Sequence, residues 1–94
     1  MIVVRETFVA KPGMASKLAR LMVEALGGGP GRFRVLTDMV GVFNTVVLET
    51  ELESLAAFEQ RVQEYRTNEQ LRSRIAGYTD LYSEGRREIY QVVE

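Results

Sequence analysis

The segment 8–18 constrains the fold more than any other, because it joins an alternating apolar strand to an amphipathic helix. A strand is predicted over residues 2–9, where apolar side chains fall on both faces. Pro12 suits the first position of the helix, since its missing N–H needs no partner there. The helix is predicted to run to about Leu26. Its apolar stripe at helical spacing is formed by Met14, Leu18, Leu21, Met22 and Leu26.

A glycine-rich loop and a hairpin follow this helix. Residues 27–31 read Gly-Gly-Gly-Pro-Gly, which ends the helix because glycine accepts a left-handed conformation and proline blocks continuation. Phosphate-binding loops lead from a strand into a helix, whereas this loop leads from a helix into a strand, so we interpret it as a flexible linker. Strands are predicted from Arg32 to about Met39 and from Val42 to Thr50. A turn at Gly41 would make them an antiparallel hairpin.

The remainder is predicted to be helical as far as Gly85, with a strand from Arg87 to Val93 at the end. Residues 50–53 have the spacing of a capping box, and Ser54 is a second candidate for the helix cap. Residues 67–68, Thr-Asn, break or cap the helix. The apolar stripes on either side of that break are formed by Leu55, Phe58, Val62 and Tyr65, and by Leu71, Ile75, Tyr78 and Tyr82.

The resulting order of elements is β-α-β-β-α-β, which is the ferredoxin-like α+β pattern. Right-handed crossovers would place both helices on one face of a four-stranded antiparallel sheet. The other face has no helix left to cover it, yet it carries apolar residues such as Val47 and Tyr90. Monomers seldom expose such a patch, so we expect a homodimer whose sheets pack face to face. The alternative is a second face that is mixed in character and solvated.

Composition bounds the function. The chain has 94 residues, which fits a single domain over 1–94, and a net charge of −1, which favours neither a nucleic-acid nor a membrane-surface partner. No apolar run is long enough to span a membrane, and the charges at residues 5 and 6 come too early for a signal peptide, so we expect a cytoplasmic protein. Cysteine and histidine are both absent. We therefore expect no metal site, no cofactor and no histidine-based catalysis.

Polar residues within apolar patterns are the candidates for a ligand site. Asn44 lies among apolar strand residues, where an amide must find hydrogen bonds or cost about 1–3 kcal/mol. Tyr65, Tyr78 and Tyr82 lie on the helical stripes, where an apolar ring with a polar tip suits either a pocket wall or the core. Charges within strands, such as Arg34, indicate cross-strand ion pairs. The alternative is an anion-binding arginine or an acid–base glutamate in a pocket.

The whole chain resembles the dimeric α/β-barrel superfamily, and in particular its small members that are antibiotic-biosynthesis-monooxygenase-like or NIPSNAP-like. The resemblance rests on four segments: Ile2-Val3-Val4, Lys11-Pro12-Gly13, the hairpin from Thr37 to Glu49, and residues 88–93, Glu-Ile-Tyr-Gln-Val-Val. It implies a dimeric barrel with a pocket between sheet and helices in each subunit. Such a fold does not by itself assign a function.

The resemblance suggests two functions. Some relatives oxidise aromatic compounds without a cofactor, using Asn, Trp, Tyr and Arg, which would place Asn44, Tyr65, Tyr78, Tyr82 and Arg34 around a small aromatic or conjugated substrate. Haem-degrading relatives use His and Trp, which this sequence lacks. The alternative function is a non-catalytic dimeric module that binds a small apolar ligand, or an ACT-like regulatory domain with the same order of elements. An RNA-binding domain of this order is disfavoured because its aromatic strand motif is missing.

Overall fold

A single antiparallel sheet with the strand order β2-β3-β1-β4 forms one layer of the protein. The computed structural model describes residues 1–29 and 31–94. The elements in chain order are β1 (Ile2–Ala10), α1 (Ala15–Leu26), β2 (Arg32–Thr37), β3 (Thr45–Leu52), α2 (Leu55–Thr67), α3 (Glu69–Arg74), a 3-10 turn η1 (Tyr78–Asp80) and β4 (Tyr82–Gln91). This arrangement confirms the predicted ferredoxin-like α+β fold.

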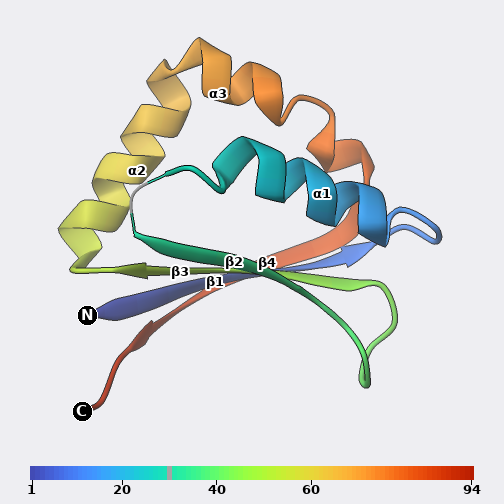
Figure 1. The fold of residues 1–94 in the computed structure, drawn as a ribbon, viewed down its shortest axis with the longest axis horizontal. Coiled ribbons are helices and arrows are strands. Elements are labelled where there is room, and N and C mark those ends of the chain that lie inside the picture. Colours follow the sequence, from blue (N-terminus) through green and yellow to red (C-terminus); the bar gives the residue numbers. More distant parts are fainter. Residues whose placement is uncertain (30) are drawn as a thin grey trace.

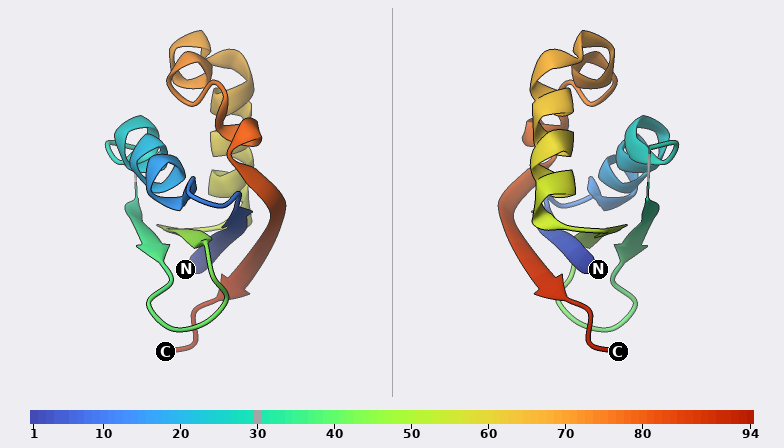
Figure 2. Two further views of the ribbon diagram at one scale, coloured as in Figure 1. Left: turned by 90° about the vertical axis from the view of Figure 1, so that its right-hand side faces the viewer. Right: turned by 90° about the vertical axis from the view of Figure 1, so that its left-hand side faces the viewer.

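All the helices lie on one side of the sheet (Figure 1), as expected. Figure 2 shows α1 beside the pair formed by α2 and α3, both above the same face of the sheet. We call the face toward the helices the inner face and the opposite one the outer face. The register of β1 with its neighbours pairs Val4 with Thr50 and Ile89 on the inner face, and Arg5 with Glu49 and Glu88 on the outer face.

The core lies between the inner face and α1. Leu18 on α1 and Val46 on β3 are completely shielded from solvent, and Met22 on α1 is 2% exposed. Other buried members of this cluster are Phe8, Ala10, Ala25, Leu48, Ile75 and Leu81. The buried side chains of α1 are Leu18, Met22 and Ala25. Leu18 and Met22 belong to the apolar stripe predicted from the sequence, and the other members of that stripe, Met14, Leu21 and Leu26, are partly buried against the same core.

The helix boundaries follow local chemistry. Helix α1 begins at Ala15 and not at Pro12, because Gly13 adopts a positive φ of 80° and holds residues 12–13 in a turn. The predicted capping box is also wrong, since β3 continues through Leu52. Ser54 is the cap of α2, and its hydroxyl accepts from the Ala57 N–H at 3.2 Å. Asn68 separates α2 from α3 and caps the latter, confirming the predicted break.

The hairpin between β2 and β3 differs from the prediction. The strands end at Thr37 and resume at Thr45, so a seven-residue loop replaces the expected tight turn at Gly41. The Asp38 carboxylate accepts from the Thr45 N–H at 3.0 Å, which closes the loop. The helical region also ends earlier than predicted, since β4 begins at Tyr82. Pro30, which was predicted with the neighbouring glycines to end this helix, falls outside the described residues.

No helix within residues 1–29 and 31–94 combines the length and the apolar character that crossing a membrane requires.

Candidate functional site

A partly enclosed cavity of about 460 Å³ lies between the inner face of the sheet and the helices. We call it the inner cavity. Strands β1, β2 and β3, with Arg87 of β4, form its floor, and α1, α2 and α3 form its walls. Its apolar lining includes Val4, Phe8, Met22, Ala25, Phe33, Leu48, Leu52, Phe58, Val62, Tyr65, Leu71, Ile75 and Tyr78. A volume of this size matches pockets that enclose small organic molecules.

Aromatic rings close one end of the inner cavity. The rings of Phe8 and Tyr78 meet edge to face, with centroids 6.4 Å apart and an interplanar angle of 81°. Tyr82 lies against both, 4.7 Å from Phe8 and 5.9 Å from Tyr78. Gly85 faces this cluster from β4, and a Cβ there would lie 3.1 Å from the Phe8 ring. The absence of a side chain at Gly85 therefore lets the Phe8 ring pack closely against β4.

An ion pair introduces charge into this apolar surface. Glu6 is on the inner face of β1, and its cross-strand partner Arg87 donates to the carboxylate at 3.3 Å. The Arg87 guanidinium also lies 5.2 Å from the centre of the Phe58 ring on α2, a cation–π distance. Both charged residues line the inner cavity, and the side chains of Glu6 and Arg87 are 30% and 50% exposed. A ligand would therefore find an acceptor and a donor side by side at this point.

The hydroxyl of Tyr78 is a neutral group over a wide pH range. Burial is the main cause that raises the pKa of Tyr78 to about 12, with further contributions from Tyr65, Tyr82 and the Glu6 carboxylate. A phenol that holds its proton so firmly can donate a hydrogen bond at neutral pH but cannot act as a base.

The structure brings together two of the five residues proposed from the sequence. Tyr65 on α2 and Tyr78 at η1 both line the inner cavity. Tyr82 does not line the cavity but packs against the rings of Phe8 and Tyr78. The prediction that Tyr82 continues a helical stripe is wrong, because it is the first residue of β4.

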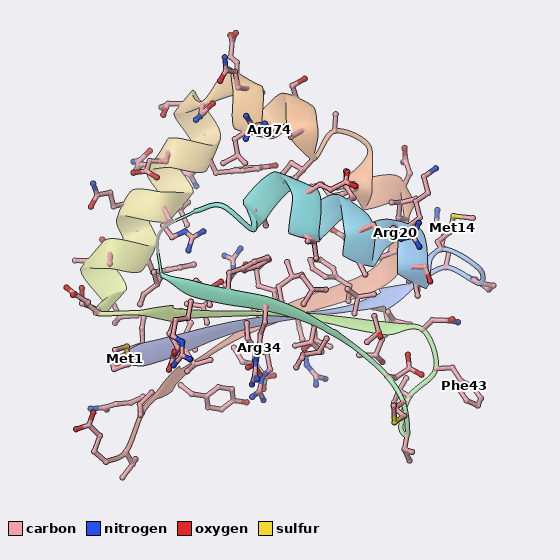
Figure 3. The ribbon with its side chains drawn as sticks, in the orientation of Figure 1. Met1, Met14, Arg20, Arg34, Phe43 and Arg74 are labelled. Carbon is pink, nitrogen blue, oxygen red and sulfur yellow. The ribbon has the colours of Figure 1, made fainter. Side chains whose placement is uncertain are left out.

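Asn44 and Arg34 lie away from the inner cavity. The expectation that Asn44 occupies a strand face is wrong, because it adopts a positive φ of 65° at the end of the hairpin loop. Its backbone carbonyl accepts from the Ala10 N–H at 2.8 Å. Arg34 points to the side of the sheet opposite the helices (Figure 3), where it belongs to the outer face.

The outer face carries an ion network centred on Glu49. Arg5 donates to one carboxylate oxygen of Glu49 at 2.8–2.9 Å, and Arg34 donates to the other at 2.8–3.0 Å. The Glu49 side chain is 11% exposed. The hydrogen bond from Arg34 is the largest influence that holds the pKa of Glu49 below its usual value, and Arg5 adds to it against the opposing effect of burial.

Sequence reasoning gave no role to Phe58 and Arg87 in the site and left Glu6 among several possible charges. The signal for Glu6 was present, because a glutamate interrupts the inner-facing series Ile2, Val4 and Phe8. Arg87 could be found only through the register that pairs it with Glu6 across β1 and β4. Within the described part of the chain, no group of three or more acidic residues gathers closely enough to hold a metal ion.

The fold is shared with two groups of solved structures. An uncharacterized NIPSNAP domain protein from Burkholderia xenovorans superposes with a TM-score of 0.85 at 14% identity, covering 99% of this chain and 95% of that one. A NIPSNAP family protein from Agrobacterium tumefaciens gives 0.81 at 14% identity, with 99% and 93% covered. A proposed antibiotic biosynthesis monooxygenase from Deinococcus radiodurans gives 0.73 at 17% identity, with 100% and 94% covered.

The sequence matches no protein-family model and no curated protein. At these identities the structural likeness establishes the fold, and it confirms at that level the resemblance to NIPSNAP-like and monooxygenase-like proteins.

Proposed function

We propose that this NIPSNAP-like and monooxygenase-like fold serves here to bind a small aromatic or conjugated molecule in the inner cavity. The observation that carries the proposal is the cavity itself: about 460 Å³ of space lined by five aromatic rings, with the Glu6–Arg87 ion pair at its floor. The helices add further charged side chains to the lining, namely Glu24, Arg61, Glu64 and Arg74. Flat rings stack or meet edge to face with aromatic side chains, so Phe33, Phe58 and Tyr65 favour a planar guest over a flexible chain.

The ion pair would orient the bound molecule. A phenolic hydroxyl can donate to the Glu6 carboxylate, and a carbonyl or carboxylate can accept from the Arg87 guanidinium, which α2 already positions through Phe58. Tyr78 adds a hydroxyl whose proton is retained at neutral pH. A planar molecule bearing one hydroxyl or carbonyl is the ligand that suits this combination.

Ligand binding is tested by filling the cavity. Calorimetry with a panel of phenols, naphthols and hydroxyquinones is expected to find binding to the wild-type protein. Val62→Trp, in the cavity wall, should lower the affinity for the ligand at least about tenfold, because the indole would occupy the volume that the ligand fills. Val23→Trp is the matched control, since Val23 is 51% exposed on α1 and does not line the cavity. Equal affinities for the two variants would contradict the proposal.

Oxidation of the bound molecule is the second candidate function, favoured by the position of Glu6. A carboxylate beside an aromatic guest can take the proton of a phenol, and the electron-rich phenolate can then react with O₂. One oxygen atom becomes a ring carbonyl, the other leaves as water, and the phenol becomes a quinone, so the substrate supplies all four electrons. The solved structure from Deinococcus radiodurans, described above as a proposed antibiotic biosynthesis monooxygenase, supports this function.

Oxygen consumption separates the two functions. If the protein is an oxygenase, compounds that bind will be turned over, and Glu6→Gln will remove turnover while the ligand still binds. Glu24→Gln is a control at the cavity rim, on α1. Binding without turnover across the panel would leave the protein as a binding module.

The same proposal includes a homodimer in which the outer faces of two subunits pack together. The two sheets would then enclose a barrel-like interior. Two features support it. Apolar side chains on the outer face are left without cover by the helices, namely Val3, Val9, Leu36, Val47 and Tyr90. The charges on that face are balanced, with four arginines and four glutamates: Arg5, Arg32, Arg34, Arg86, Glu49, Glu51, Glu84 and Glu88. A face that carries both signs can match a copy of itself under a two-fold rotation.

A further inference from the structure

The loop between β2 and β3 concentrates exposed apolar side chains at its tip. Met39 and Val40 are 96% and 95% exposed, and Val42 and Phe43 are 69% and 82% exposed. We call residues 39–43 the hairpin arm. None of its residues is charged. Apolar surface gathered in this way marks an interaction site, because isolated proteins seldom leave it in water.

The arm has a defined shape and direction. The Thr45 hydroxyl donates to the Val42 carbonyl at 2.8 Å, and the Asp38 carboxylate accepts from the Thr45 N–H, so the base of the arm is tied to β3. Figures 1 and 2 both show the loop descending on the side of the sheet away from the helices. Figure 3 shows Phe43 on the limb of the loop that leads into β3, with its side chain directed away from the subunit. The arm therefore projects beyond the outer face and away from the inner cavity.

We propose that the hairpin arm of each subunit packs on the outer face of a second copy of the chain. This inference rests on the homodimer proposed above and names the element that would complete it. Apolar surface is the first argument. Stable interfaces bury about 800 Å² of accessible surface on each partner. The arm adds four exposed apolar side chains, Met39, Val40, Val42 and Phe43, on the side of the sheet where the outer faces would meet.

Charge is the second argument. A membrane surface would require basic residues around the apolar tip, but the nearest charge in the sequence is that of Asp38, at the base of the arm. The outer face of another copy offers apolar side chains among charges that already balance, which is the environment an uncharged arm requires.

Symmetry indicates where the arm would lie. The chain that leaves β4 also descends on the outer side, at the end of the sheet opposite the arm (Figure 1), and Val93 there is 92% exposed. A two-fold axis across the middle of the outer face would bring the arm of one subunit to this end of its partner. Tyr90, 44% exposed, lies on the outer face of β4 near this end. Each arm would then pack near Tyr90 and Val93, and the contact would form twice.

The absence of tryptophan allows a direct test. Phe43→Trp places one indole at the tip of the arm, and Val23→Trp places one on the exposed side of α1 as a control. Sedimentation velocity over a dilution series reports dimerisation, while emission wavelength and acrylamide quenching report exposure of the indole. The expected result is a dimer in which the indole of Phe43→Trp is shielded and becomes exposed on dilution, whereas that of Val23→Trp is exposed throughout. The double variant Met39→Ser/Phe43→Ser should raise the dimer dissociation constant at least about tenfold.

Each other outcome overturns a specific part of the inference. A dimer in which the arm indole stays exposed, or a double variant that dimerises as wild type, rejects the arm and leaves the dimer standing. A monomer at every concentration rejects the dimer and the arm together, while calorimetry of the same samples still reports whether the inner cavity binds aromatic ligands. An arm indole shielded by phosphatidylcholine–phosphatidylserine vesicles, and not by self-association, assigns the arm to a membrane surface and rejects the proposal.

Discussion

Replacing Glu49 with glutamine tests the ion network on the outer face. In the wild-type protein each carboxylate oxygen of Glu49 receives one guanidinium, from Arg5 and from Arg34, at distances between 2.8 and 3.0 Å. Glutamine keeps the shape of the side chain but has one carbonyl oxygen and one amide NH₂. It can accept from one arginine only, and its NH₂ group faces the N–H donors of the other.

The exposure of each group sets the size of the effect. Glu49 is 11% exposed, Arg5 40% and Arg34 69%. A hydrogen bond to a charged group contributes about 1.5–3 kcal/mol, whereas an exposed arginine contributes about 0–1 kcal/mol. We therefore expect Glu49→Gln to lower the free energy of unfolding by about 2 kcal/mol. For a chain of this size that corresponds to a fall in Tm of about 8–16 °C.

The effect of pH has a definite sign. The pKa of Glu49 in the folded protein is held below the usual 4.5, chiefly by the hydrogen bond from Arg34. A carboxyl whose folded pKa is depressed contributes stability that is complete above its unfolded pKa and is lost as pH falls through its folded pKa. The difference between wild type and Glu49→Gln should thus be constant from pH 6 to 8 and shrink below about pH 4.5.

Urea unfolding followed by circular dichroism measures this difference, at one fixed protein concentration because self-association adds to apparent stability. Glu51→Gln is the matched control, since its pairing with Arg32 spans 3.6 Å and that arginine is 89% exposed. The control should change stability by no more than about 0.5 kcal/mol. Equal losses in both variants, or a Glu49 effect that persists undiminished at pH 3, would refute the reasoning.

Three further predictions follow from the fold. Leu18→Ala should lower the free energy of unfolding by about 3–4 kcal/mol because Leu18 is fully buried, whereas Val23→Ala, at a position 51% exposed, should change it by less than about 0.5 kcal/mol in the same urea assay. Gly31→Ala combines a φ of +84° with a Cβ only 2.6 Å from a backbone oxygen of β3, so its loss in Tm should exceed that of Gly13→Ala, which has a φ of +80° and open space. Tyr78→Phe should remove the last phenol ionisation, near pH 12, from an ultraviolet absorbance titration; because the folded pKa is raised above 10, its stabilising contribution is present below pH 10 and disappears as pH rises through 12.

Periodicity, together with turn and cap signals, predicted the architecture. The alternation in residues 2–9 and the stripe on α1 each pointed to one structure, and both agree with the element order that defines the ferredoxin-like fold. The cap at Ser54 could also be predicted, because a serine immediately before a helical pattern typically accepts a hydrogen bond from a free N–H of the first turn. Such signals succeed where one local preference agrees with the global fold.

Prediction from local sequence patterns failed where one pattern is compatible with two kinds of secondary structure. Met39 and residues 42–44 were predicted to be strand and proved to belong to an exposed loop, so Asn44 was wrongly assigned to a strand face. Tyr82 follows Tyr78 at a helical interval, yet Gly77 with a φ of 85° precedes a turn into β4. The pairing of Glu6 with Arg87 depends on register between segments far apart in sequence, which no short window contains.

The strand order has a consequence for how the protein is made. The first strand of the chain is a central strand of the sheet, and its partner on one side is the last: Ile2 pairs with Gln91, and Val4 with Ile89. The sheet is therefore dominated by contacts between distant segments, a topology associated with slow folding. During synthesis β1 would emerge before the other strands of this sheet and wait for β4, with only β3 available to cover one of its edges. Until β4 arrives, the other edge of β1 remains an unpaired template, which makes this interval the period of greatest risk for association between nascent chains.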